Sequence, residues 1–71
     1  MTKREMIAAI QFAEAVAWKR FNNNKAVLGA ADEITMRSRS AWAAVHDVMK
    51  AMKVSGMPME ELIAKNLLPE L

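Results

Sequence analysis

Hydrophobic residues recur along the first part of the chain with the period of an α-helix. They follow one another at spacings of four, three, four and four, and form one stripe along the helix at about 100° per residue: Met6, Ile10, Ala13, Ala17 and Phe21. Thr2 and Glu5 fit a capping box at the start. Asparagines at 22–24 favour an end, because asparagine tolerates the left-handed conformation. The pattern predicts a helix over about residues 3–23.

A second helical pattern begins at Asp32, a good N-cap whose negative charge also suits the helix dipole. Glu33 and Arg37 add a supportive pair four residues apart. The pattern predicts a helix over about residues 32–53. Its apolar stripe consists of Ile34, Ala41, Val45, Val48 and Met52, and we expect this stripe to meet the first one in a common core.

The segments around these two helices are short. We expect the connection over residues 25–31 to tuck Val27 and Leu28 under the hairpin. After a stop at residues 54–56, Pro58 suits the first position of a third helix over about residues 58–66. The buried face of that helix is predicted to hold Met59, Leu62, Ile63 and Leu67.

These elements predict a single all-α domain over residues 1–71, an antiparallel two-helix hairpin with a short C-terminal helix. The first helix is apolar over more than half of its circumference, which one neighbouring helix cannot cover. The chain has no cysteine and one histidine, so neither a disulfide nor a usual structural zinc site can supplement so small a core. We therefore expect a homodimer, a four-helix-type bundle, with Ile7, Val16 and Trp18 as the candidate oligomer interface.

Charge changes this picture little. The net charge is +2, with nine basic against five acidic residues over 1–57 and a mildly acidic tail. Lys3 and Arg4 precede an apolar run, but Gln11 and Glu14 interrupt it, which argues against a secretory signal. No stretch approaches the roughly 18 apolar residues of a membrane span. We expect a cytoplasmic protein.

One side of the second helix combines positive charge with an aromatic ring. The candidate nucleic-acid face consists of Arg39, Trp42, His46, Lys50 and Lys53. Basic groups bind phosphates and an aromatic ring can stack on a base. The interpretation we favour is a solvated helix face on which Trp42 seals the hairpin core.

Residues 30–40 are also faintly similar to a helix-turn-helix. Thr35 stands where that motif usually has a turn glycine, and a β-branched residue is ill suited to positive φ. The unbroken apolar period from Ile34 to Met52 favours one continuous helix.

No catalytic pattern stands out. There is no glycine-rich phosphate loop and no set of paired carboxylates, and His46 has only Asp47 beside it in sequence, pointing elsewhere on the helix. We expect a non-enzymatic protein with no cofactor and no metal.

The segment from Trp18 to Trp42 resembles small helical-hairpin proteins of phages and prophages of gut Firmicutes. The resemblance covers about residues 13–53 and is carried by Trp18, Phe21, Leu28, Gly29, Asp32, Thr35, Arg39 and Trp42. It implies a phage or prophage accessory protein that acts through protein contacts. The predicted function is a protein-interaction or assembly module; the alternative is a small DNA- or RNA-binding protein that uses the basic face of the second helix.

Overall fold

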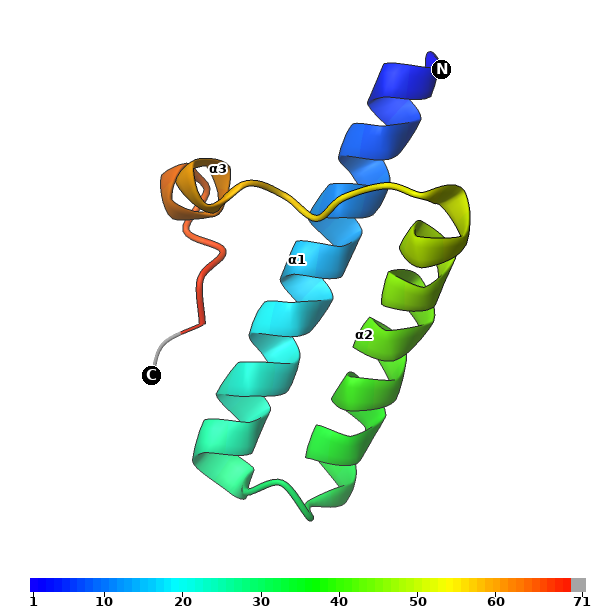
Figure 1. The fold of residues 1–71 in the computed structure, drawn as a ribbon. Coiled ribbons are helices and arrows are strands. Elements are labelled where there is room, and N and C mark those ends of the chain that lie inside the picture. The colour runs from blue at the N-terminus through cyan, green and yellow to red at the C-terminus, as the bar shows by residue number, and fades with distance from the viewer. Residues whose placement is uncertain (70–71) are drawn as a thin grey trace.

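The computed structural model describes residues 1–69 and contains three helices: α1 (Lys3–Leu28), α2 (Glu33–Met52) and α3 (Met59–Ala64). The long helices α1 and α2 run antiparallel, side by side, and the tail carries α3 back to the other side of α1 (Figure 1). The all-helical hairpin with a short C-terminal helix is confirmed, with no strand in the described part of the chain.

The start of α1 follows from its sequence. The backbone N–H of Glu5 donates to Oγ1 of Thr2 at 3.1 Å, as the capping box predicts. The end differs from the prediction, because α1 continues past the asparagines to Leu28 and stops at Gly29, where φ is +88°. Asn24 explains part of the difference: its Nδ2 donates to Oγ of Ser38 on α2 at 3.0 Å, so tertiary contact holds it in the helix.

Helix α2 is continuous from Glu33 to Met52, which excludes a turn near Thr35 and with it the helix-turn-helix interpretation. Asp32 accepts from the backbone N–H of Ile34 at 2.9 Å and caps the helix as predicted. The helix ends at Lys53 in the left-handed conformation, with φ +58°.

The tail packs on α1 around a small apolar cluster. Met57 and Leu67, on either side of α3, are buried with Ala15, and Val16 and Leu62 pack against them. Two polar contacts hold the tail at its ends: Nε2 of Gln11 donates to the carbonyl of Ser55 at 2.9 Å, and Nζ of Lys19 to that of Asn66 at 2.7 Å.

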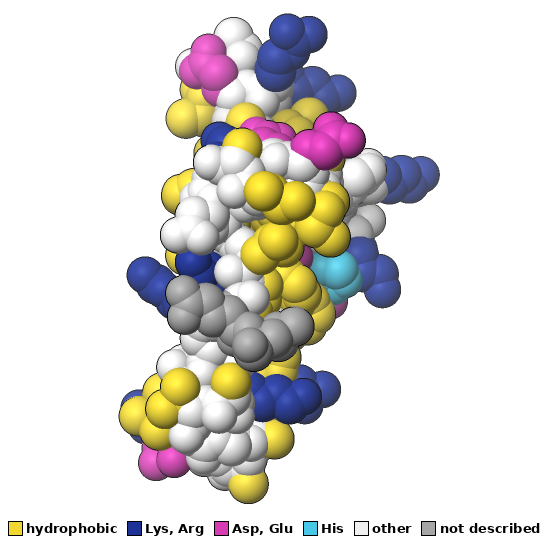
Figure 2. All heavy atoms as spheres, turned by 90° about the vertical axis from the view of Figure 1, so that its left-hand side faces the viewer, with side chains coloured by type: hydrophobic (Ala, Val, Ile, Leu, Met, Phe, Trp, Pro, Cys, Tyr) yellow, Lys and Arg dark blue, Asp and Glu magenta, His cyan; other side chains and the backbone are white. Residues whose placement is uncertain are grey.

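Helix α3 itself contributes less than predicted. Leu67 is buried and Leu62 partly buried, but Met59 and Ile63 are each 60% exposed. Viewed from the side of α3, hydrophobic side chains gather over the middle of the molecule and basic side chains lie at its edges (Figure 2). Within α3 only Leu62 packs against the buried cluster, so Met59 and Ile63 remain open to solvent.

The two apolar stripes that were predicted to form the core are not fully buried within one chain. Ile10, Phe21 and Val45 are partly buried, but Ala13 and Ala41 are exposed, as are the four large residues Met6, Ile34, Val48 and Met52. The fully buried positions between α1 and α2 are instead Thr35 and Met49. Val27 and Leu28 do not tuck under the hairpin either, since they are 81% and 43% exposed.

Candidate interaction surface

An exposed apolar surface lies on one side of the hairpin and takes residues from both long helices. Two hollows mark it: Met6 and Met52 line the first, and Ala17, Ile34 and Ala41 the second. Helical periodicity places Ala13 and Val48 on the same side. We call the surface formed by these seven residues the open face: Met6, Ala13, Ala17, Ile34, Ala41, Val48 and Met52.

The tail leaves the open face uncovered because it packs on the other side of α1. Ala15, which contacts the tail, comes nine residues after Met6, or about two and a half helical turns, and so points to the opposite side. The large side chains of the open face are therefore left at 46–55% exposure, the values for Met52 and Ile34.

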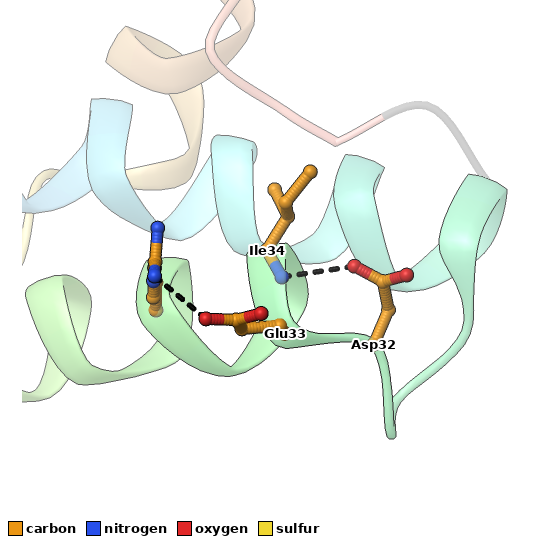
Figure 3. A network of polar contacts seen from close by, with 4 residues as sticks. Asp32, Glu33 and Ile34 are labelled. Atoms are coloured by element: carbon orange, nitrogen blue, oxygen red, sulfur yellow. Dashed lines mark hydrogen bonds and ion pairs between the residues drawn. The ribbon is translucent and has the colours of Figure 1, made fainter.

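Charged residues border the open face at both ends. Lys3 and Lys53 line the hollow with Met6 and Met52, and Arg20 and Arg37 line the one with Ile34. Nη2 of Arg37 binds Oε1 of Glu33 at 2.6 Å beside the Asp32 cap at the start of α2 (Figure 3). Both partners are more than three-quarters exposed, so this ion pair contributes little to stability.

The three residues of the sequence-predicted interface do not form one patch. Ile7 is partly buried and lines the hollow with Met6 and Met52. Trp18 shares that side of α1 by periodicity, whereas Val16, nine residues after Ile7, points the other way and packs against the tail cluster. The sequence pattern missed the open face because it assigned those residues to the intramolecular core.

Four residues of the predicted nucleic-acid face, Arg39, Trp42, His46 and Lys50, share one side of α2 by periodicity, whereas Lys53 follows the end of α2 and lines the hollow with Met6 and Met52. The aromatic ring of this face also contacts α1. Nε1–H of Trp42 donates to Oε1 of Glu14 on α1 at 3.0 Å. The Trp42 ring stacks near His46 at 4.9 Å and near Phe21 at 6.3 Å between centroids. Arg39, Lys50 and Lys53 are all exposed. Trp42 thus links the two helices while the cations stay in solvent.

Within residues 1–69, no three His, Cys, Asp or Glu side chains come together as a metal site would require. His46 contacts the Trp42 ring. In the same part of the chain, no helix is both long and apolar enough to cross a membrane.

Comparisons of the chain with protein-family models, with curated proteins and with solved structures gave no match.

Proposed function

We propose that this chain is a self-associating protein-interaction module, in which two copies pack open face against open face as a four-helix bundle. The single observation that carries the proposal is the open face itself, an exposed apolar surface with residues from both long helices. A surface of this kind on a small protein marks an interaction site.

The accessible surface area of the chain supports a second copy as the partner. The chain exposes 5325 Å². A compact monomer of its 7.9 kDa mass is expected to expose about 4400 Å², which leaves an excess of about 900 Å². A standard protein interface buries about 800 Å² on each partner. The excess is close to what one copy would lose in a stable dimer.

The composition of the open face favours helices as the partner. Its centre holds small residues, Ala13 and Ala17 on α1 and Ala41 on α2. Small side chains let two helix pairs approach to an interaxial distance of about 8–10 Å, as in closely packed helices. Larger side chains at both ends, Met6 with Met52 and Ile34, can interdigitate around that centre. A two-fold axis through the centre needs only one self-complementary patch, which is the commonest arrangement.

In the biological setting implied by the resemblance to phage helical-hairpin proteins, such a dimer acts as an accessory or assembly protein through protein contacts. The chemistry of the open face supports binding, because this surface offers apolar area bordered by charge.

Two neighbouring positions at the start of α2 give a matched test. Ile34 lies on the open face and Met36 does not, yet they are 55% and 56% exposed. We expect Ile34→Gln to weaken self-association at least tenfold and Met36→Gln to leave it unchanged, as measured by sedimentation equilibrium between 1 and 200 μM. A chain that stays monomeric over this range would refute the proposal. Trp18→Gln in the same series tests the sequence-predicted interface, which stays a prediction.

Cross-linking can locate the contact directly, because the chain has no cysteine of its own. A single Ala41→Cys variant should form a disulfide-linked dimer under mild oxidation if Ala41 lies near the two-fold axis, and Ala13→Cys and Val48→Cys extend the scan along the face. Met36→Cys is the control for random collision. Equal cross-linking at all four positions would count against a defined interface.

A further inference from the structure

A third hollow lies on the side of the hairpin away from the open face, near the connection between the long helices. Its volume is about 410 Å³, and it is lined by Phe21, Lys25, Ala30, Arg39 and Trp42. Small-molecule sites occupy about 300–1,000 Å³, so the hollow has the size of a site for one small ligand. Arg39 comes five residues after Ile34 on α2, about 140° around the helix, which separates this hollow from the open face.

The aromatic wall of the hollow is held in place from within the chain. Trp42 donates its Nε1–H to Glu14 at 3.0 Å and stacks near the ring of His46. The rings of Phe21 and Trp42 lie 6.3 Å apart between centroids with 19° between their planes, so they present a nearly parallel pair. A wall fixed before binding avoids part of the entropy that ordering it would cost.

Two cations complete the lining, and neither is neutralised. Lys25 and Arg39 are exposed, and neither forms a salt bridge with any described residue. No acidic side chain lines the hollow. The guanidinium of Arg39 can bind two phosphate oxygens at once, and Lys25 adds a compact positive charge.

We propose that this hollow binds a nucleotide, with the base against the Phe21–Trp42 wall and the phosphate on Lys25 and Arg39. The combination of aromatic rings with adjacent cations is the one by which proteins hold single nucleotides of a strand without hydrogen bonding to the base edges. The ligand chemistry is a nucleoside monophosphate unit, supplied either free or by a single-stranded nucleic acid. The inference does not depend on self-association, because the hollow and the open face share no residue.

Tryptophan fluorescence reports on the hollow once the other tryptophan is removed. In a Trp18→Phe background, Trp42 is the single tryptophan of the chain. We expect AMP and UMP to quench its emission saturably, and adenosine or inorganic phosphate alone to bind at least tenfold more weakly. Phosphate binding as tightly as AMP would overturn the proposal, as would no saturable quenching by either nucleotide up to 10 mM.

Substitution of the cations tests the position of the phosphate. Lys25→Gln and Arg39→Gln should each weaken AMP binding about tenfold, the usual effect of losing a charge-assisted hydrogen bond. Lys50→Gln is the matched control, because Lys50 lies on the same side of α2 but does not line the hollow. Circular dichroism verifies that each variant is folded. An equal loss in all three variants would assign binding to the basic face of α2 as a whole and overturn the site.

The source of the nucleotide is decided by a short oligonucleotide. A (dT)₆ strand that binds more tightly than UMP, with a slope of log affinity against log salt near −1.4 for two phosphate contacts, identifies a single strand as the ligand. Equal affinity of the strand and the mononucleotide identifies a free nucleotide. A monomeric chain that still binds AMP would refute the proposed self-association and leave this site intact.

Discussion

Thr35 is the most deeply buried polar residue of the hairpin, at 1% exposure, and its Oγ1 has no hydrogen-bond partner in the structure. A buried hydroxyl that is not paired carries a desolvation cost of about 1–3 kcal/mol. Its neighbour Ser38 avoids the same cost, because its hydroxyl donates to the carbonyl of Ile34 at 2.8 Å. The unpaired hydroxyl of Thr35 therefore lowers the free energy of unfolding of the hairpin.

We therefore expect Thr35→Val to raise the free energy of unfolding by about 1 kcal/mol, because valine keeps the branched shape and removes the unpaired group. Urea denaturation followed by circular dichroism measures the change. Thr35→Ser is the control, since it keeps the hydroxyl, loses a methyl group and should lower stability. A loss of stability in the valine variant would show that the hydroxyl is bonded in solution.

At the scale of the elements, the two long helices begin where their capping side chains lie. Asp32 accepts from the backbone N–H of Ile34, and Thr2 from that of Glu5. Such caps satisfy donors that have no partner inside the helix. Asp32→Ala should lower the free energy of unfolding by about 1 kcal/mol, and Asp32→Asn by much less. Thermal unfolding compares the two, and equal losses would mean that the cap is not what Asp32 contributes.

The tail is held by the residues that flank α3 more than by α3 itself. Leu67 is 8% exposed in the cluster with Ala15, whereas Ile63 is 60% exposed. Leu67→Ala should lower the free energy of unfolding by about 2 kcal/mol, because it removes buried methyl groups and leaves a cavity. Ile63→Ala should lower it by much less. Urea denaturation at low protein concentration, where self-association is weakest, provides the comparison. Similar costs would mean that the tail packs differently in solution.

At the scale of the whole molecule, a small core is combined with a large uncovered surface. Five described residues are buried. A domain of this size is only marginally stable by itself, so a partner that binds the folded form adds directly to its stability. Self-association through the open face would supply that stabilisation.

The midpoint of thermal unfolding should consequently rise with protein concentration, because mass action stabilises the folded dimer relative to the unfolded chain. Differential scanning calorimetry over a hundredfold range of concentration tests this. In Ile34→Gln the dependence should largely disappear, while in Met36→Gln it should persist. A wild-type midpoint independent of concentration would argue for a stable monomer.

The helices and most of their ends follow from local sequence. The stop of α2 and the caps at Thr2 and Asp32 depend on residues within a few positions of each other, so local patterns predict them. The end of α1 was predicted too early, because the bond from Asn24 to Ser38 joins two helices and no local pattern contains it.

Which side of each helix is buried depends instead on contacts between distant parts of the chain. Helix α1 is apolar over so much of its circumference that periodicity alone cannot say which part a neighbour covers. The tail covers the side of α1 that carries Ala15. Helix α2 buries Thr35 and Met49, and its Trp42 donates a hydrogen bond to Glu14 on α1. Seven of the ten residues predicted as core became the open face, because burial depends on where the whole chain folds back as well as on the spacing of hydrophobic residues.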